Sequence, residues 1–331
     1  MFSKQIDFLA IGDIVTDAFI KLKDAHVTDC IDHRARELCV KFADKIPFES
    51  VDVIAAVGNS ANAAVSASRL GLSSALVSDL GNDIYGKECL DSLKRDKVGS
   101  KYVTAHKGMP TNYHYVLWYD SERTILVKHQ DYPRKLPRFP EPKWIYLSSL
   151  GGNSEGYHAE IAGYLEKHPG VKLAFQPGTF QMSLGVEKLK AIYARADVFF
   201  CNKEEAQRIL KTEESDPKRL MEMVRGLGPK IVVVTDGPNG AYAYDGADAF
   251  FMPVYPDPKP AYERTGAGDA FASTFTVALA LGKSLDEALR WAPINSASVV
   301  QDVGAQRGLL SKEKLAEWLA KAPADYKPKK I

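Results

Sequence analysis

Short apolar runs alternate with helical patterns along most of the chain. The runs show no polar alternation, so each predicts a strand that is buried on both faces. Strands are predicted at Phe8–Ile11, Val53–Val57, Ala75–Val77, Trp144–Leu147, Leu173–Phe175, Val198–Phe200 and Ile231–Val234. Helices are predicted around Asn62–Leu70, Gly86–Arg95, Gly156–Lys167, Lys203–Leu210, Pro217–Arg225 and Ala270–Leu281. This order predicts an α/β fold with a mostly parallel central sheet flanked by helices.

Two segments interrupt this alternation and favour antiparallel strands. One is Val15–Lys21, with the polar stretch that follows it to Pro47, and the other is the pair Thr111–Tyr119 and Glu122–Lys128 around Asp120-Ser121. Tyr113 and Tyr115 stand two residues apart and are expected on one face of their strand. We expect a small β-sheet, inserted at about residues 14–50 and 110–130, that forms a lid over a pocket. An ordinary edge hairpin is the alternative.

Composition narrows the function classes. The chain has 331 residues and a net charge of +1, so no excess of positive charge favours nucleic acid or an anionic membrane as a partner. The four cysteines, Cys30, Cys39, Cys89 and Cys201, show neither zinc-ligand spacing nor a disulfide framework. A reducing cytoplasm is the expected location, and no apolar stretch approaches the length that spans a membrane.

The stretch from Glu263 to Asp269, Glu-Arg-Thr-Gly-Ala-Gly-Asp, carries the strongest chemical signal. It opens a predicted helix with two glycines, each of which costs roughly 1 kcal/mol of helix stability against alanine. Close approach of a ligand to the backbone explains that cost, because the N–H groups of Gly266, Ala267 and Gly268 can bind an anion at a helix N-terminus. Asp269 beside such an anion is suited to take a proton from an attacking hydroxyl. In the alternative interpretation Thr265 is an ordinary N-cap and Asp269 an ordinary first-turn acid.

Two polar segments follow predicted strands in the first part of the chain. Asp13 and Asp17 come after the first strand, where carboxylates commonly accept hydrogen bonds from a ligand's hydroxyls, although a capped turn is the alternative. Gly58-Asn59-Ser60-Ala61-Asn62 places two amides three residues apart at a helix start, so both can reach one ligand. Asn62 as a simple helix cap is the competing interpretation.

Two further segments follow later strands. Asn202-Lys203-Glu204-Glu205 places Asn202 and Glu205 on one face of a helix start, a suitable position for a carboxylate that holds hydrated magnesium, although Asn-x-x-Glu is also a good capping pair. The turn from Thr235 to Gly240 is rich in glycine, which allows the backbone to approach a nucleotide or to form a hairpin.

In this order and spacing the chain resembles the ribokinase-like, or PfkB, family of carbohydrate and nucleoside kinases over nearly its whole length. The matching segments are Gly12-Asp13 with Asp17, Gly58–Asn62, Asn202–Glu205, Thr235–Gly240, Thr265–Asp269 and Gly304-Ala305-Gln306. The resemblance implies a single three-layer α/β domain over residues 1–331 with a β-lid, which often forms a homodimer through the lid. It also implies ATP and Mg²⁺ as cofactors.

The resemblance assigns roles to matching positions. Asp269 matches the catalytic base, and the amides of Gly266, Ala267 and Gly268 match the anion hole. Positions that match substrate contacts are Asp13, Asp17, Gly58, Asn59 and Asn62, to which the lid tyrosines Tyr113 and Tyr115 are added as stacking candidates. Positions that match the nucleotide site are Asn202, Thr235, Gly237 and Gly240, with Asn295 added near the adenine wall, and Glu205 matches the magnesium motif.

Several residues depart from the family pattern. Val57 replaces the first of two glycines common in the substrate motif. Glu263 stands where the family usually has aspartate in a monovalent-cation loop, which leaves potassium activation an open question. Gln176-Pro177-Gly178-Thr179 stands where fructokinase-like members carry Asp-Pro-Asn and a following arginine, which argues against a plain fructokinase.

The function expected from the sequence is ATP- and magnesium-dependent phosphorylation of a hydroxymethyl group on a small sugar. A nucleoside kinase, with lid aromatics stacked on a base, is the alternative among enzymes. A non-catalytic sugar- or nucleoside-binding protein on the same fold is the alternative from another class. A dehydrogenase is disfavoured because no G-x-G-x-x-G follows the first strand.

Overall fold

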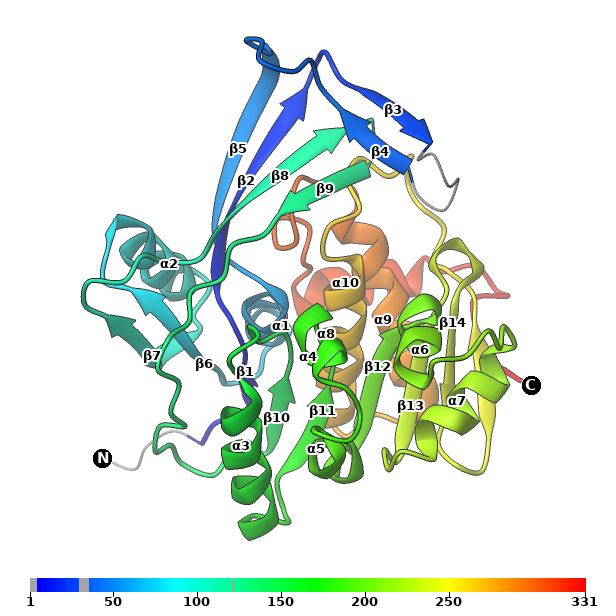
Figure 1. The fold of residues 1–331 in the computed structure, drawn as a ribbon. Coiled ribbons are helices and arrows are strands. Elements are labelled where there is room, and N and C mark those ends of the chain that lie inside the picture. Colours follow the sequence, from blue (N-terminus) through cyan, green and yellow to red (C-terminus); the bar gives the residue numbers. More distant parts are fainter. Residues whose placement is uncertain (1–4, 30–35, 121) are drawn as a thin grey trace.

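A ten-stranded sheet forms the centre of the computed structural model, which describes residues 5–29, 36–120 and 122–331 (Figure 1). The strand order is β16-β15-β14-β13-β12-β11-β10-β1-β6-β7. The bounds are β1 (Phe8–Ile11), β6 (Ser74–Gly81), β7 (Gly99–His106), β10 (Trp144–Leu147), β11 (Lys172–Phe175), β12 (Val198–Asn202), β13 (Ile231–Thr235), β14 (Ala241–Tyr244), β15 (Ala249–Met252) and β16 (Lys329–Lys330). All pairs from β7 to β13 are parallel, whereas β14, β15 and β16 pair antiparallel. The predicted mostly parallel sheet is therefore confirmed.

The strands from β7 to β15 contribute to two hydrophobic cores, one on each face of the sheet. In β1, Phe8 and Ala10 pack into one core and Leu9 and Ile11 into the other, because successive side chains point to opposite faces. One core is covered by α1 (Asn59–Arg69), α2 (Ile84–Arg95), α8 (Ala267–Ala280), α9 (Leu285–Val299) and α10 (Lys312–Ala320). The other is covered by α3 (Glu155–Lys167), α4 (Thr179–Leu184), α5 (Lys190–Arg195), α6 (Lys203–Leu210) and α7 (Pro217–Arg225). The result is the three-layer arrangement that the continuous apolar strands predict.

A separate four-stranded sheet, called the lid below, stands above the main sheet (Figure 1). Its order is β5-β2-β8-β9, with bounds β2 (Val15–Leu22), β5 (Phe48–Val57), β8 (Tyr113–Tyr119) and β9 (Glu122–Leu126). A two-stranded ribbon of β3 (His26–Asp29) and β4 (Arg36–Cys39) extends from it. Phe19, Val116 and Trp118 of the lid pack on Val303 of the main body. The lid is thus attached to the rest of the chain by a small core of its own.

One strand was assigned to the wrong sheet by the sequence-based prediction. Val53–Val57 was expected among the parallel strands, but it is the end of β5, which pairs antiparallel with β2 in the lid. A short apolar run does not by itself determine its partner. Here Val53 is half exposed, and only Ala56 and Val57, next to the main body, are buried.

Chain order around β1 positions the site. β1 pairs parallel with β10 on one side and with β6 on the other. The order in which the chain adds strands to the sheet therefore reverses next to β1. In open α/β sheets, ligands bind outside the carboxyl ends of the strands at such a reversal. Just past these ends, the N–H of Asp13 donates to Ser149 O at 2.8 Å.

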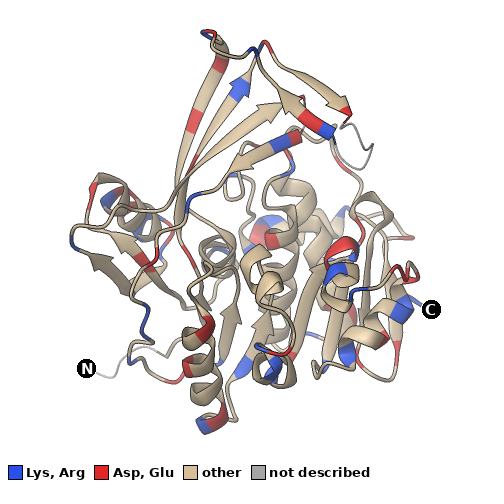
Figure 2. Ribbon diagram, in the orientation of Figure 1, with Lys and Arg blue, Asp and Glu red and all other residues tan. Residues whose placement is uncertain are grey.

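Other expectations concern the cysteines, membrane spans and the distribution of charge. Cys39, Cys89 and Cys201 are free thiols, whereas Cys30, Ser121 and part of the insertion at residues 14–50 lie outside the described residues. Over the described ranges no helix has the length and apolarity needed to cross a bilayer. Figure 2 shows acidic and basic residues interspersed over the lid and the main body, in keeping with the net charge of +1.

Candidate active site

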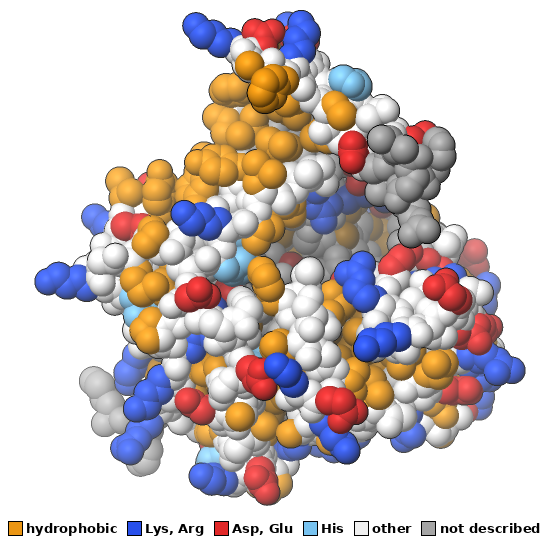
Figure 3. All heavy atoms as spheres, in the orientation of Figure 1, with side chains coloured by type: hydrophobic (Ala, Val, Ile, Leu, Met, Phe, Trp, Pro, Cys, Tyr) orange, Lys and Arg blue, Asp and Glu red, His pale blue; other side chains and the backbone are white. Residues whose placement is uncertain are grey.

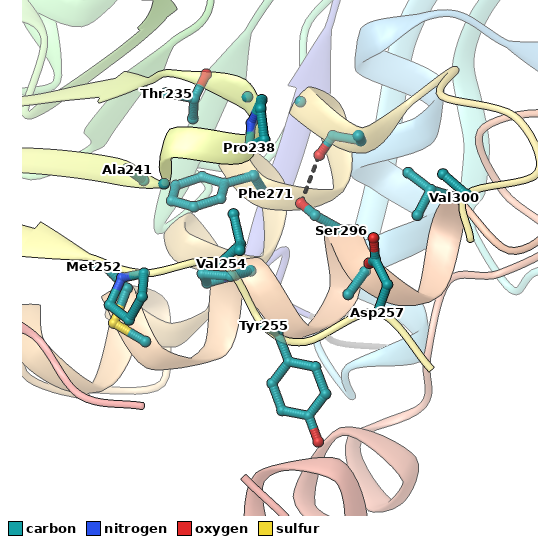
Figure 4. Close-up of a pocket in the computed structure, with 18 of the residues that line it drawn as sticks. Thr235, Pro238, Ala241, Met252, Val254, Tyr255, Asp257, Phe271, Ser296 and Val300 are labelled. Atoms are coloured by element: carbon teal, nitrogen blue, oxygen red, sulfur yellow. Dashed lines mark hydrogen bonds between the residues drawn. The ribbon is translucent and has the colours of Figure 1, made fainter. Parts of the chain in front are cut away.

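Two adjoining cavities open at the carboxyl ends of the strands. The larger, called the lid cavity, has a volume of about 580 Å³ and lies beneath the lid, where Figure 3 shows the surface hollowed. The smaller, called the side slot, has a volume of about 380 Å³ and is shown in Figure 4. Both are lined by Thr235, Arg264, Gly268 and Phe271. A molecule in one cavity therefore meets a molecule in the other at the start of α8.

The start of α8 has the open backbone that the two glycines predict. Gly266 is the N-cap with φ of +80°, and a Cβ there would lie 2.3 Å from the Cβ of Ala305, so only glycine fits. Gly268 has no such conflict, because a Cβ there would enter open space. Within the described part of the chain no side chain caps this N-terminus, so the first N–H groups of α8 are free to bind an anion. The alternative in which Thr265 is the N-cap is wrong, since Thr265 Oγ1 donates to Glu263 instead.

Asp269 lies in the first turn of α8 and is held by two amides. Asn62 Nδ2 donates to Asp269 Oδ2 at 2.8 Å, and Gln176 Nε2 donates to Oδ1 at 3.2 Å. Each amide is oriented by another side chain: Gln306 Nε2 donates to Asn62 Oδ1 at 2.9 Å, and the buried Tyr146 hydroxyl donates to Gln176 Oε1. All of these groups except Tyr146 and Gln306 line the lid cavity. The carboxylate is thus fixed in direction before any ligand arrives.

Burial raises the pKa of Asp269, although the hydrogen bonds from Asn62 and Gln176 and the charge of Arg123 act in the opposite direction. Glu205 lines the same cavity, and its pKa is raised by burial and, to a smaller extent, by the negative charge of Asp269. Two carboxylates in one partly dehydrated cavity disfavour each other's ionised form. A bound cation would relieve that repulsion.

Asn202 and Glu205 form the capping pair that was weighed against a metal role. Asn202 Oδ1 accepts from the N–H of Glu205 at 2.7 Å, and Glu205 Oε2 accepts from the N–H of Asn202 at 2.9 Å. The two roles are compatible, because a carboxylate has two oxygens and both residues line the lid cavity. In the described residues no cluster of three or more His, Cys, Asp or Glu side chains could hold a metal ion. Magnesium fits nonetheless, since it is commonly held by one or two carboxylates together with waters and phosphates.

Comparison with known proteins identifies the family. Residues 41–312 match the family described as pfkB family carbohydrate kinase. The chain belongs to the pfkB family. It is accordingly a phosphotransferase that acts on an alcohol group.

Individual relatives of this pfkB-family chain differ in substrate. An ATP-dependent 6-phosphofructokinase of Thermoanaerobacterium thermosaccharolyticum is 29% identical over 270 residues, which cover 75% of this chain and 80% of that protein. A nucleoside kinase of Methanothermobacter thermautotrophicus is 26% identical over 258 residues, which cover 76% and 80%. The structure of Arabidopsis thaliana ribokinase complexed with ribose and ATP superposes with a TM-score of 0.80 at 20% identity, over 96% of this chain and 99% of that one. The ribokinase fold is therefore shown, whereas the relatives leave the acceptor open.

The residues predicted to contact the acceptor divide into two groups. Asp17, Gly58, Asn59 and Asn62 line the lid cavity. Asp13 lines neither cavity, because its carboxylate is occupied: Oδ2 accepts from Gly151 N at 2.8 Å, from Arg134 Nη2 at 3.0 Å and from His129 Nδ1 at 3.0 Å. Burial alone would raise the pKa of Asp13, but His129 and Arg134 outweigh it and lower the pKa, so Asp13 stays ionised. In this structure Asp13 is a buried anchor, and its role as a substrate contact stays a prediction.

The two tyrosines of the lid, predicted to stack on a ligand, lie away from both cavities. Tyr113 and Tyr115 line neither cavity; they contact each other, and Tyr113 packs on Tyr85. His114, between them, lines the lid cavity instead. The alternation of side chains was read correctly, but which face is the inner one depends on how the lid docks.

Sequence reasoning missed several residues of the lid cavity. These are His114, Arg123, His129, Gln176, Phe180 and Arg264. The position of His114 could have been inferred from the sequence, because a residue between two tyrosines that face outward must itself face inward. Gln176 was noticed only as a departure from the family pattern. Arg123 and His129 follow from the docking of the lid, which no local pattern encodes.

Three of the five residues predicted for the nucleotide lie at the side slot, whereas Asn202 lines the lid cavity and Asn295 lines neither. Thr235, Gly237 and Gly240 line the side slot, together with apolar side chains such as Val254 and Phe271 (Figure 4). Asn295 does not: it is fully buried, donates to Thr274 Oγ1 at 2.8 Å and accepts from the N–H of Leu310 at 2.9 Å. In this structure Asn295 ties α9 to its neighbours, and its role as a nucleotide contact stays a prediction. The next residue, Ser296, lines the slot and donates to Ala267 O at 2.7 Å, which ties α9 to α8 (Figure 4).

Glu263 organises the loop before α8. Its carboxylate accepts from the N–H of Thr265 at 2.7 Å, from the Thr265 hydroxyl, and from the N–H of Gly304 at 3.2 Å. Arg123 of β9 places Nη1 3.9 Å from Glu263 Oε1. The buried carboxylate of Glu263 is thus paired mostly with groups of the main body, and one further partner, Arg123, comes from the lid.

Proposed function

We propose that this chain is an ATP- and magnesium-dependent kinase that transfers the terminal phosphoryl group of ATP to a hydroxymethyl group of a sugar. The observation that carries the proposal is the position of Asp269, in the first turn of an uncapped helix at the junction of two cavities. A carboxylate beside a phosphoryl-binding N-terminus is electrostatically unfavourable unless it accepts a proton from the attacking group.

The side slot suits the nucleotide. Its volume of about 380 Å³ and its apolar lining by Met252, Val254 and Phe271 suit a planar base, and Gly237 leaves room for close approach of the backbone. The phosphates would then extend toward Gly268 and Thr235, which both cavities share. That the Arabidopsis thaliana ribokinase structure holds ATP supports the assignment.

The acceptor would occupy the lid cavity with its reacting hydroxyl at Asp269. Asn62 and Gln176 hold the carboxylate so that its remaining lone pairs face the cavity, where it takes the proton as the oxygen attacks. The N–H groups at the start of α8 stabilise the charge that develops on the transferring phosphoryl group. The lid above excludes water, which would otherwise be phosphorylated in place of the acceptor.

Magnesium would be held by Glu205, with its waters and the phosphates of the nucleotide completing the coordination. When bound, it neutralises charge on the transferring phosphoryl group. The raised pKa of Glu205, caused first by burial and then by nearby carboxylates, is consistent with a position suited to a cation.

An ATP-consumption screen of pentoses, hexoses, ketoses and nucleosides tests the proposal, with Asp269→Asn as the matched variant. We expect turnover of at least one acceptor and a loss of about 10² to 10⁴-fold in kcat in the variant, with ATP affinity by calorimetry unchanged. A variant that keeps more than about a tenth of kcat would remove Asp269 from the role of base. Demonstrated ligand binding without any turnover would favour the non-catalytic binding protein.

A further inference from the structure

Three rings from three separate segments stand together in the wall of the lid cavity. His114 of β8 lies with its ring centroid 5.2 Å from that of His129, and His129 lies 5.2 Å from Phe180 of α4. All three line the lid cavity and none lines the side slot. Aliphatic side chains of Val15, Ile125 and Val127 line the same cavity. This set of rings and aliphatic groups is called the ring wall below.

The ring wall is held from behind by buried charges. His129 Nδ1 donates to Asp13 Oδ2, which also accepts from Arg134 and from the N–H of Gly151. The Arg134 side chain is 2% exposed, and its Nε donates to Asn153 Oδ1 at 3.2 Å. His129 therefore has a fixed orientation before a ligand binds, as expected of a preorganised subsite.

Two polar atoms at the ring wall have no hydrogen-bond partner within the described residues. They are Nε2 of His114 and Oδ1 of Asp17, both of which are buried on residues that line the lid cavity. His114 Nδ1 lies 3.4 Å from Asp17 Oδ1, a long ion-pair contact that does not count as a hydrogen bond. Buried polar groups are nearly always paired, so these two point to hydrogen bonds supplied by a ligand.

A free sugar matches this wall poorly, because hydroxyl groups around its ring would face aliphatic and aromatic side chains without partners. A planar heterocycle matches it better, since its faces stack on rings and its edge offers both a donor and an acceptor. We propose that the sugar acceptor carries a planar heterocyclic substituent, as a nucleoside does, and that the ring wall binds this substituent. The inference rests on the proposed function for the position of the sugar but makes a separate claim about binding.

Equilibrium binding without ATP tests the claim independently of catalysis. Adenosine, guanosine, cytidine, uridine, ribose and phenyl β-ribofuranoside are titrated into the wild-type protein by calorimetry. We expect at least one nucleoside to bind about 100-fold or more tightly than ribose, with the phenyl riboside between them because it stacks but has no hydrogen-bonding edge. Ribose binding as tightly as every nucleoside overturns the inference. Free sugars turned over without nucleoside binding also overturn it and leave the kinase intact, whereas tight nucleoside binding without turnover supports it and overturns the kinase.

Variants of the ring wall separate stacking from edge recognition. Phe180→Ala is expected to weaken the preferred nucleoside by about 5- to 150-fold, the equivalent of about 1 to 3 kcal/mol of stacking on one base. His114→Phe keeps a ring but removes the polar edge, so it should bring the preferred nucleoside and the phenyl riboside to similar affinities. Tyr115→Ala is the matched control, since Tyr115 follows His114 on the same strand but lies outside both cavities. Nucleoside affinity that Phe180→Ala and His114→Phe leave unchanged, in protein that melts like the wild type, overturns the inference.

Discussion

The side-chain amide of Gln176 donates to Asp269 Oδ1 at 3.2 Å while its own oxygen accepts from the hydroxyl of Tyr146. Tyr146 is fully buried in β10, and burial raises the pKa of its hydroxyl well above the ordinary value, so it is a neutral donor at every pH of interest. A donor on that side forces the amide to present its N–H₂ group to Asp269. Tyr146 therefore determines which end of Gln176 the carboxylate meets.

Removal of this support should change the pH dependence of the reaction. Burial raises the pKa of Asp269 and the bond from Gln176 lowers it, so Gln176→Leu should raise the pKa further. Because the base must be ionised, the acidic limb of kcat/KM should move to higher pH. The pH–rate profiles of the variant and the wild type measure this displacement.

Tyr146→Phe should move the same limb in the same direction by less, since the amide remains but loses its fixed orientation. Tyr193→Phe is the control, because it removes another buried hydroxyl from a residue that lines neither cavity. A pH–rate profile that coincides with the wild type for both Gln176→Leu and Tyr146→Phe would contradict the positioning role.

The two glycines of α8 should respond to alanine in opposite ways. Gly266→Ala places a side chain at φ of +80° against Ala305, so it should lower the free energy of unfolding by about 1 to 3 kcal/mol. Gly268→Ala meets open space in a helix, so it should leave stability unchanged or raise it by up to about 1 kcal/mol, yet reduce kcat because the methyl group obstructs the phosphoryl group. Denaturant melts and initial rates check both. Loss of stability together with activity in Gly268→Ala would mean that this glycine serves only the backbone.

Glu205→Gln should raise the magnesium concentration at half-maximal rate about tenfold, because one unit of negative charge beside the hydrated cation is lost. Glutamine is also a good capping-box residue at this position, so the cap formed with Asn202 should survive. Glu204→Gln is the control, since Glu204 is adjacent but does not line either cavity. Identical magnesium titrations for the two variants would leave Glu205 as a helix cap alone.

The outer face of the lid exposes a row of apolar side chains across three strands. Val53 is 50% exposed, Tyr115 49% and Leu126 52%, and strand register aligns them through Ala18. Figure 3 shows hydrophobic side chains gathered on one side of the lid. Such a face is a candidate for association, and we propose that two copies pair through it. Val53→Asp should then shift sedimentation from dimer to monomer, whereas Phe42→Asp, at a fully exposed residue outside these strands, should not. A wild-type chain that sediments as a monomer at tens of micromolar would contradict this.

Much of the fold and part of the site follow from local patterns. Continuous apolar strands separated by helices require a sheet covered on both faces, and that sheet was predicted. The glycines before Asp269 could also be interpreted from the local sequence. Glycine lowers the stability of a helix, so two glycines at a helix start indicate a role other than stability. Asn202 and Glu205 were weighed as a cap or as a site pair; the structure shows the cap and places both side chains at the lid cavity, where the magnesium role stays a prediction.

The amino-acid sequence by itself determined the three layers, the helix start at Gly266 and the chemistry that Asp269 can perform, because these depend on periodicity and residue type within one segment. Only the tertiary structure decided that β5 joins the lid, that His114 rather than Tyr113 or Tyr115 faces the cavity, and that Asp13 is occupied by Arg134. Those outcomes depend on which surfaces meet. A strand offers two equivalent faces, and a carboxylate offers the same oxygens to a ligand or to an arginine from 121 residues away. Packing between distant segments makes the choice.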